Sequence, residues 1–307
     1  MKTFHILNLG AGVQSTEIYL LAADGVLEDE LGIKFDLAIF ADPGDEPWQV
    51  YHHLRWMMRE HARENWSRLT HCFYDNWTAP PIWIRTKFHD NGNPIILGDQ
   101  LLVGQNSTGG RFASIPAFTK TKGSEKPSGM TRRQCTKEFK VEVIEKAIRR
   151  ELLGLSAGQR IPEGIEIRQY FGFSTDEPGR AARTRGRFDA KGPQWSVGFP
   201  LIELGYTRRD CEMDLESRVP HEVISSRCVY CPFQTPAMWR QMKRDPRNWY
   251  RATQVDNGLR TTGASANRKL DQELYVHRSG KPLAEAYLEE DQTHFPFYGE
   301  CEGGCGL

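Results

Sequence analysis

The feature that most constrains the fold lies near the N-terminus, where an apolar run meets a glycine-containing turn and then an apolar-periodic segment. Residues 4–9 are typical of a buried parallel strand, and residues 15–22 of a helix. Gly10 and Gly12 permit a tight turn and a close approach of a ligand to the backbone. A strand that leads through such a turn into a helix points backbone N–H groups and the positive helix end at one place. The segment therefore predicts a phosphate or pyrophosphate site, although a plain strand-to-helix turn has the same appearance.

The elements that follow alternate between strand and helix. Further strands are expected at 35–41, 69–74 and 165–173, and helices at 46–64 and 137–153. This alternation implies right-handed crossovers and a parallel sheet with helices on both faces. We predict an α/β fold, a doubly wound parallel sheet of the Rossmann-like type, with a smaller, mainly helical C-terminal region.

Composition divides the chain into two predicted domains. Residues 1–190 form the nucleotide-binding α/β domain, and residues 191–307 the C-terminal region with a CxxC motif and a cysteine tail. Residues 76–130 are rich in Gly, Pro, Asn, Ser and Thr and are poor in periodic pattern. Since an irregular segment of this length is seldom inert, we predict a functional flap there.

Charge and hydropathy exclude several classes of protein. Lys and Arg number 40, as do Asp and Glu, so no global field draws the chain to nucleic acid or to a membrane. No apolar run approaches the roughly 20 residues of a membrane helix. The first residues lack the apolar region of a signal peptide, and we expect a cytoplasmic protein without a membrane partner.

An acidic segment follows the second predicted strand. Asp42 would lie at the carboxyl end of that strand, beside the first loop, where ligands of doubly wound sheets bind. Its carboxylate can accept a hydrogen bond from an adenosine hydroxyl or hold magnesium. Asp45 and Glu46 come next and are expected to favour the start of the following helix electrostatically. His53 lies on that polar helix and is expected at the surface.

Seven cysteines in a cytosolic chain favour metal or sulfur chemistry over structural disulfides. Cys228 and Cys231 form a CxxC motif followed by proline, which suits a redox pair, half of a zinc site or a coincidence. With Cys135 they make three thiolates, a set suited to a [4Fe–4S] cluster with one open iron. A structural zinc would need a fourth ligand, for which His221 and Cys211 are candidates, and free or redox-active thiols are the third alternative.

The C-terminal tail carries two more thiols, Cys301 and Cys305, among glycines. Glycines make such a segment mobile, and a mobile thiol can shuttle between sites. A frayed end with incidental cysteines is the simpler alternative.

Six motifs in one order carry a family resemblance. They are LGAGVQST, AIFADPGDEP, RRQCTKEFKV, YFGFSTDEPGR, FPLIELGYTRRDC and SRCVYCPF. Together they resemble the PP-loop adenine nucleotide alpha-hydrolase superfamily over residues 3–250, and within it the phosphoadenylylsulfate (PAPS) reductase-like branch. The chain departs from the usual SGGxDS loop, since Gly10 and Ala11 occupy the first Ser-Gly positions and Gln14 stands where Asp is common. The tail is similar to the C-terminal Glu-Cys-Gly-Leu-His nucleophile segment of sulfonucleotide reductases, without the final His.

The resemblance implies a fold of the HUP type and a loop that grips the pyrophosphate of ATP, with Mg2+ as the metal ion. The implied nucleotide-binding residues are Gly10, Ala11, Gly12, Gln14, Ser15, Thr16, Asp42, Asp176 and Arg183. The implied catalytic residues are Ser15, Asp42, Arg180 and Cys305. Guanidinium groups of Arg180 and Arg183 suit phosphate oxygens, although a run of arginines is more often a solvated face. Arg208 and Arg209 are ambiguous in the same way.

Three functions follow from these expectations. The first is an ATP pyrophosphatase that activates an acceptor for sulfur incorporation, the acceptor being the DNA backbone or a tRNA base, with a cysteine desulfurase or another sulfur donor as partner. The second is a PAPS or adenylylsulfate reductase with Cys305 as nucleophile. The third is a nucleotide-binding module without turnover. We also expect a homo-oligomer.

Overall fold

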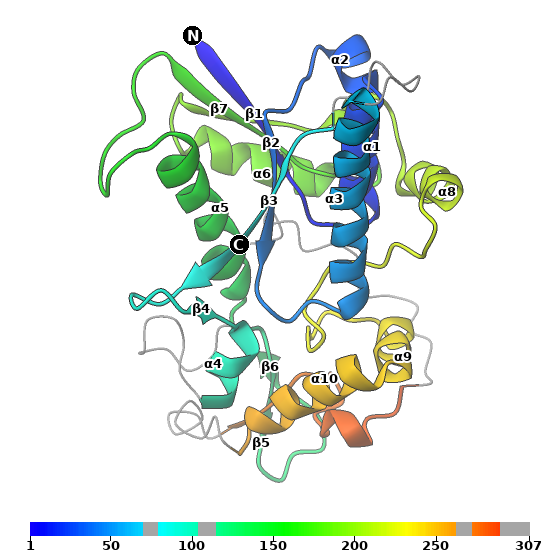
Figure 1. Ribbon diagram of the computed structural model, residues 1–307. Coiled ribbons are helices and arrows are strands. Elements are labelled where there is room, and N and C mark those ends of the chain that lie inside the picture. Colours follow the sequence, from blue (N-terminus) through cyan, green and yellow to red (C-terminus); the bar gives the residue numbers. More distant parts are fainter. Residues whose placement is uncertain (70–78, 104–114, 262–271, 289–307) are drawn as a thin grey trace.

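The computed structural model describes residues 1–69, 79–103, 115–261 and 272–288, and within them the side chains of all but 60–69. The described chain forms a large upper layer around a six-stranded sheet and a smaller lower layer around a three-stranded sheet (Figure 1). Among the described residues, none of the helices has the length and apolar character that crossing a membrane requires.

The large sheet is mostly parallel. Its strand order is β4-β3-β2-β1-β7-β8, and only β4 runs antiparallel to its neighbour. The strands are β1 (Lys2–Asn8), β2 (Leu37–Asp42), β3 (Ile82–Phe88), β4 (Pro94–Ile95), β7 (Ile165–Tyr170) and β8 (Trp195–Gly198). The chain proceeds outward from β1 to β3 on one side and from β7 to β8 on the other. The order therefore reverses between β1 and β7, the place where such sheets open a crevice for ligands.

Helices cover both faces of this sheet, as the alternating pattern predicts. α1 (Val13–Ala23) and α3 (Trp48–Leu69) lie on one face (Figure 1). α5 (Glu142–Ala147) and α6 (Pro178–Asp189) lie on the other. Successive residues of β1 point to opposite faces, so that Leu7 packs in the α1 core and Ile6 in the α5 core. The predicted α/β class with helices on both sides of a parallel sheet is confirmed.

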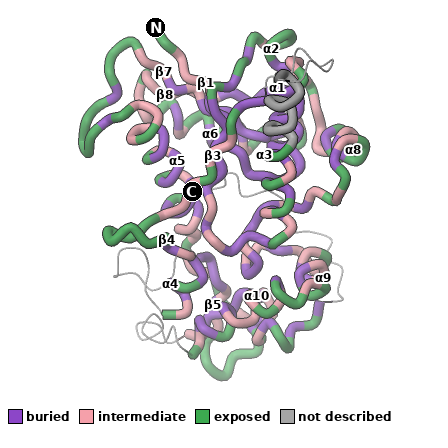
Figure 2. Tube along the Cα trace, viewed as in Figure 1, coloured by how far each residue is buried: buried purple, intermediate pink, exposed green. Residues whose placement is uncertain are grey.

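The helix α1 is unusual because every one of its residues is buried. The sheet covers one side, and α8 (Arg208–Arg218) packs against the other. Figure 2 shows buried residues along β1 and the adjoining helix. A helix buried all round has little amphipathic pattern, and in α1 the polar residues Gln14–Glu17 of the first turns are buried along with the apolar ones that follow.

The third strand lies later in the chain than predicted. A strand was expected at 69–74, but α3 continues to Leu69, and residues 70–78 lie outside the described part. The strand is β3, and it lies within the segment 76–130 that was predicted to be irregular. Its residues are half-buried or exposed, and Arg85, Thr86 and Lys87 interrupt its apolar residues. A search for a continuous apolar run therefore passes over it.

The lower layer combines segments that are far apart in sequence. Its sheet has the order β6-β5-β9, and α10 packs against α4 and α9. Its elements are α4 (Leu97–Val103), β5 (Phe118–Thr121), β6 (Gly129–Met130), α9 (Pro236–Arg244), α10 (Pro246–Gly258), β9 (Gln272–Tyr275) and the short helix η3 (Leu283–Glu285). The predicted division at residue 190 falls between α6 and β8, inside the large layer. The described residues also form the short helices α2 (Val26–Leu31) and α7 (Pro200–Glu203), and two π-helical turns, η1 (Lys137–Val141) and η2 (Ile148–Leu152), flank α5.

Candidate functional site

The loop from β1 to α1 closes on itself through Ser15. The backbone N–H of Gly10 donates to Ser15 Oγ over 3.2 Å, and Ser15 Oγ donates to the carbonyl of Gly12 over 3.3 Å. Ala11 between the two glycines has φ 56°, a left-handed conformation that is uncommon outside glycine. Gly12 is the N-cap of α1, and no side chain caps the helix there. The start of α1 thus lies at the carboxyl edge of β1, and its first backbone N–H groups point toward that edge.

Gln14 connects this loop to the end of β7. Its Nε2 donates to Ser174 Oγ and to Glu177 Oε2, both over 2.8 Å. Its Oε1 accepts from Arg208 Nη1 over 3.3 Å. The side chain is only 1% exposed, so these bonds form in a nearly dry environment. The residue that departs from the usual loop pattern therefore ties together both strands of the switch point and the start of α8.

Thr16 faces the helix α3 rather than the open edge of the sheet. Its hydroxyl lies 2.8 Å from Nε2 of His53, and Nδ1 of that ring lies 3.0 Å from Nε2 of His221. His53 is 2% exposed, so the expected surface position is wrong. Burial, followed by the nearby His221 and His52, lowers the pKa of His53 to about 3. At neutral pH the imidazole of His53 is therefore uncharged, and it holds the Thr16 side chain through this hydrogen bond.

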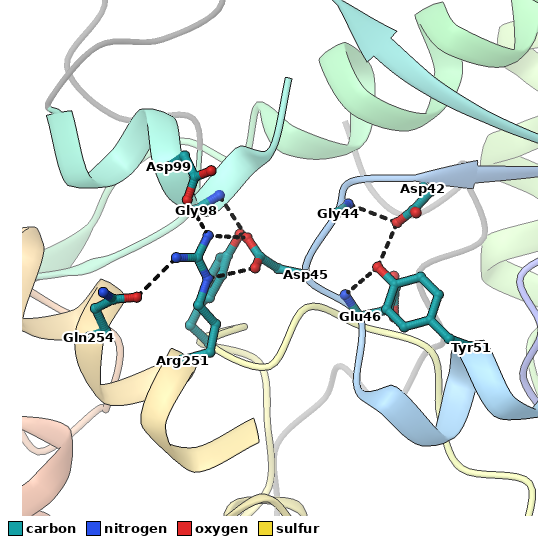
Figure 3. A network of polar contacts seen from close by, with 10 residues as sticks. Asp42, Gly44, Asp45, Glu46, Tyr51, Gly98, Asp99, Arg251 and Gln254 are labelled. Carbon is teal, nitrogen blue, oxygen red and sulfur yellow. Dashed lines mark hydrogen bonds and ion pairs between the residues drawn. The ribbon is translucent and has the colours of Figure 1, made fainter. Parts of the chain in front are cut away.

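Asp42 ends β2 and is half-buried (Figure 3). Its Oδ1 accepts from the backbone N–H of Gly44 over 2.7 Å and from the Tyr51 hydroxyl over 2.8 Å. Burial raises the pKa of the Asp42 carboxyl, and these two hydrogen bonds and the Lys140 ammonium oppose the rise. One of its oxygens is thus committed to the turn after β2.

Asp45 does not act as a helix cap, as was expected, but as a buried partner of α10. Its carboxylate forms an ion pair with Arg251, with distances of 2.6 Å from Nε to Oδ1 and 3.2 Å from Nη2 to Oδ2 (Figure 3). The same carboxylate accepts from the N–H of Gly98 over 2.8 Å and from the Tyr230 hydroxyl over 2.9 Å. Four donors from three distant segments therefore converge on a residue whose neighbours in sequence suggested a local role.

Glu46 is also buried instead of capping the helix. Lys140 Nζ lies 3.2 Å from its Oε1, and the Ser226 hydroxyl donates to its Oε2 over 3.0 Å. Lys140 follows Cys135 in sequence, and Ser226 precedes Cys228. This carboxylate thus joins the two segments that carry the predicted metal-binding cysteines.

The acidic and basic residues after β7 are largely paired with one another. Asp176 is exposed, and its Oδ2 accepts from the backbone N–H of Arg208 over 2.6 Å. Arg180 forms an ion pair with Glu177 and lies 4.4 Å above the ring of Phe173. Arg183, in contrast, is exposed on α6. The structure brings Asp176 and Arg180 to the switch point, with Gln14 bridging to Glu177, whereas Arg183 lies farther along the helix surface.

A cavity of about 360 Å³ opens beside the first turn of α1, and we call it the loop cavity. Its walls include Val13 at the start of α1, Arg208 on α8 and Met238 on α9. Arg227 also lines it and is 6% exposed. One of its nitrogens donates to the carbonyl of Phe233 over 3.1 Å, but its Nε has no hydrogen-bond partner in the described chain. A buried guanidinium nitrogen without a partner is the kind of donor that an anion would satisfy.

The three predicted metal-binding cysteines line a second, smaller cavity of about 30 Å³, which we call the cysteine cavity. Cys135 precedes η1, a π-helical turn (Lys137–Val141), and Cys228 and Cys231 form a tight turn closed by a 2.9 Å backbone hydrogen bond. Burial strongly raises the pKa of the Cys228 thiol, and Glu46, Cys135 and Cys231 add to the rise, opposed by Lys140. Arg227 lines both cavities and therefore stands between the loop and the cysteines.

The three thiols that line the cysteine cavity are the type of donor that a metal cluster takes. A buried thiolate needs a neighbouring positive charge, and a bound metal supplies it. Cationic side chains also line this cavity, namely Arg133, Lys140 and Arg227. In the described part of the chain, no group of three or more His, Cys, Asp or Glu side chains is placed so that it could hold a metal ion. Cys211, a candidate fourth ligand, lies buried on α8 and does not line the cavity, and Cys301 and Cys305 fall outside the described residues.

No model of a protein family, no curated protein and no solved structure matches this chain. The site therefore has to be understood from its own geometry. That geometry places the start of α1, Arg208 and Arg227 around one cavity, together with Glu212, which pairs with Arg208 over 2.9 Å, and two further glutamates. Three thiols line the next cavity, and an anionic ligand in the first would lie close to them.

Sequence reasoning missed several residues of this site. Ser174 holds Gln14, His53 holds Thr16, and Arg227 lies between the two cavities. Arg227 directly precedes Cys228 in the SRCVYC motif, and this adjacency was the one available signal. The bonds from Gln14 to Ser174 and from Thr16 to His53 span 160 and 37 residues along the chain, so no local pattern indicates them.

Proposed function

We propose that the chain is an ATP pyrophosphatase of the PP-loop, HUP type. It cleaves ATP to AMP and pyrophosphate and thereby activates an acceptor for sulfur incorporation. The observation that carries the proposal is the wall shared by the two cavities. Arg227 lines the loop cavity, where the α1 N-terminus and Arg208 would meet phosphate, and it also lines the cavity of the three cysteines.

The loop cavity supplies donors for the triphosphate. The first turn of α1 presents backbone N–H groups and a partial positive charge, and Arg208 and Arg227 add two guanidinium groups. These donors suit the charge that develops on the departing pyrophosphate when an acceptor oxygen attacks the α-phosphorus. Asp42 lies at the adjacent strand end, where its carboxylate is available for a ribose hydroxyl or for Mg2+.

The cysteine cavity supports the sulfur step. Cys135, Cys228 and Cys231 would hold a [4Fe–4S] cluster, which supplies one open iron site for binding sulfur. Glu46 and Lys140 keep the two cysteine-bearing segments together through their buried contact. Arg227 would lie between the bound phosphates and the sulfur. Sulfur would attack the adenylylated acceptor, with loss of AMP.

The acceptor and the sulfur donor follow from the same proposal. The DNA backbone or a tRNA base would be the acceptor, and a cysteine desulfurase or another sulfur donor would be the partner. Nothing in the described residues favours one of these polymers over the other, so the assay includes both DNA and tRNA.

The decisive measurement is pyrophosphate release from ATP by anaerobically purified protein, with DNA or tRNA and a sulfur donor present. Arg208→Ala is expected to lower kcat/KM about 10- to 100-fold, because it removes a charge-assisted contact to phosphate and the bond to Gln14. Arg209→Ala is the matched control, since Arg209 is the next residue, is exposed and does not line the cavity. Sulfite release from a sulfonucleotide without pyrophosphate release from ATP would replace the proposal with the reductase.

The metal arm has its own readout. Protein purified without oxygen is expected to be brown, with the broad visible absorbance of thiolate-bound iron, and to contain iron and acid-labile sulfide. Cys228→Ser should remove the colour and the iron, whereas Cys211→Ala, which alters a buried cysteine outside the cavity, should keep both. Colourless wild-type protein that takes up no iron on reconstitution would exclude the cluster and leave the nucleotide part of the proposal standing.

A further inference from the structure

A third cavity of about 360 Å³ lies on the other face of the large sheet, between α5 and α6, and we call it the sheet cavity. Its floor comes from the strands at the switch point, with Asn8 of β1 and Gln169 of β7. Its volume is within the range of small-molecule sites, which begins at about 300 Å³. Neither the loop nor any cysteine among the described residues lines it.

The sheet separates this cavity from the loop cavity. Asn8 follows Leu7 in β1, and Gln169 precedes Tyr170 in β7. Leu7 and Tyr170 pack in the core on the α1 face of the sheet. Because alternate residues of a strand point to opposite faces, Asn8 and Gln169 point away from α1. In Figure 1, α5 lies on one side of the sheet and α1 and α3 on the other. A ligand in the sheet cavity would thus occupy a site of its own.

Two buried polar groups in the lining lack partners. Nε2 of Gln169 and the hydroxyl of Thr184 have no hydrogen-bond partner within the described part of the protein. Gln169 is 3% exposed and Thr184 is 1% exposed, so bulk water does not compensate them. An unsatisfied buried polar group costs about 1–3 kcal/mol, and a ligand or ordered water that satisfies both would recover that energy.

The remaining walls combine aromatic rings with a distorted helix. Phe171 and Phe188 supply two rings, with centroids 5.9 Å apart and an angle of 77° between their planes. Lys137 and Val141 come from η1, the π-helical turn before α5. Such turns are rare and often occur at functional sites.

The mouth of the cavity has no strong excess of either charge. Lys137, Arg187 and Lys191 line it together with Glu142 and Glu145, and Lys191 pairs with Glu145 over 2.5 Å. The deep polar groups, an amide and a hydroxyl, are uncharged. This lining favours a neutral, flat ligand with hydrogen-bonding edges over an anion or a fatty chain.

We propose that the sheet cavity is a second ligand site that binds an uncharged nucleoside through its base. The base would lie along the wall formed by Phe171 and Phe188, with its edge bonded to Gln169 and Thr184. Amide side chains pair well with base edges, and aromatic rings with base faces. This site is independent of the ATP chemistry proposed above, and its occupancy is measurable whether or not the chain cleaves ATP.

The test is isothermal titration calorimetry, which measures the affinity of the full chain for adenosine, guanosine, cytidine and uridine, each added alone. At least one should bind, and Thr184→Val should weaken it about 5- to 10-fold, because one buried hydrogen bond is lost while the shape is kept. Val141→Phe, which fills the cavity from η1, should weaken it further. Gln14→Leu is the control at the loop, on the far face of the sheet, and should leave the nucleoside affinity unchanged.

Three results would overturn the site. They are the absence of binding by all four nucleosides at millimolar concentration, equal affinity in wild type, Thr184→Val and Val141→Phe, and loss of affinity in Gln14→Leu instead. Thermal unfolding shows whether each variant is folded. If Thr184→Val is not folded, the Val141→Phe variant alone tests the site. Neither cavity variant should alter pyrophosphate release, since neither residue lines the loop cavity.

Discussion

At the scale of single residues, the loop depends on one alanine in an unusual conformation. Ala11 has φ 56° and is buried, between two glycines that the tight turn uses. A left-handed conformation costs a residue with a Cβ about 1 kcal/mol relative to glycine, and far more when the Cβ is branched. The family pattern has glycine at this position, so substitutions of Ala11 measure how much backbone strain the loop tolerates.

Ala11→Val is expected to lower the free energy of unfolding by about 2 kcal/mol or more, because a β-branched side chain combines backbone strain with crowding in a closed loop. Ala11→Gly is the matched control and should change it by no more than about 0.5 kcal/mol, since relief of strain offsets added chain entropy. Urea unfolding measures both. Equal stability of the valine variant would mean that the left-handed conformation is not required.

Gln14 shows what the sequence could and could not announce at this scale. Its place in the loop was readable from the glycines around it, and so was its departure from the common Asp. Its partners were not readable, since Ser174 and Glu177 lie 160 and 163 residues away. Contacts of that separation depend on strand order, which no local pattern specifies.

Gln14→Glu should be strongly destabilising, by about 2–3 kcal/mol, because it replaces two donations with a carboxylate facing Glu177. Adding Glu177→Gln to this variant should restore much of the lost stability, since residue 177 then supplies the amide donor and residue 14 the carboxylate acceptor. A double-mutant cycle from urea unfolding at pH 7 gives the coupling. Additive effects of the two substitutions would contradict the bond as described.

At the scale of elements, prediction succeeded where burial makes a strand or helix uniform. β1 and β2 contain apolar runs, β7 leads into the buried aromatic segment that ends at Phe173, and each was found within a few residues. β3 is half-buried and carries Arg85 and Lys87, so it lacked that signal. The connection between elements was least visible, because Asp45 was assigned to a helix start and in fact binds α10.

Arg251→Met tests that connection. It leaves the buried Asp45 carboxylate with two neutral donors, Gly98 and Tyr230, and no countercharge. We expect the free energy of unfolding to fall by about 3 kcal/mol, the usual cost of breaking a buried ion pair from one side. Adding Asp45→Asn should recover part of the loss, and Arg247→Met on the exposed side of the same helix should have little effect. Thermal unfolding checks all three, and a loss below about 0.5 kcal/mol in Arg251→Met would show that the pair does not join the layers.

At the scale of the whole molecule, the sheet divides the chemistry. The loop cavity lies against the start of α1 and α8, and the cysteine cavity includes Pro43 after β2, whereas the sheet cavity lies between α5 and α6. The doubly wound class could be predicted from the alternation of elements, but these cavities could not, because each is made by segments that meet only after the sheet has formed. Stability of the α1 side therefore bears on the loop as a whole.

The pH dependence of stability reports on that side through Glu17. This residue lies on α1, is fully buried, and has Asp214 and Arg218 of α8 beside its carboxyl group. Burial, with the neighbouring Asp214 and against Arg218, raises its pKa from 4.5 to about 8. The folded protein therefore keeps a proton that the unfolded chain releases above about pH 4.5. The stabilisation from Glu17 is complete below that pH and is lost as pH rises to about 8, by up to about 1.4 kcal/mol per pH unit.

Glu17→Gln removes this proton linkage while keeping the size of the side chain. The variant should gain stability relative to wild type as pH rises from 5 to 8, and the difference should level off above pH 8. Buried histidines such as His53, whose pKa is lowered, act in the opposite direction below pH 6.5, so the informative quantity is the difference between the two proteins. Urea midpoints at half-unit pH steps measure it, with exposed Glu30→Gln on α2 as the control that should follow wild type. A constant difference across this range would mean that Glu17 is already ionised in the folded protein, with Arg218 as its partner, and that α1 and α8 are joined by charge instead of by a shared proton.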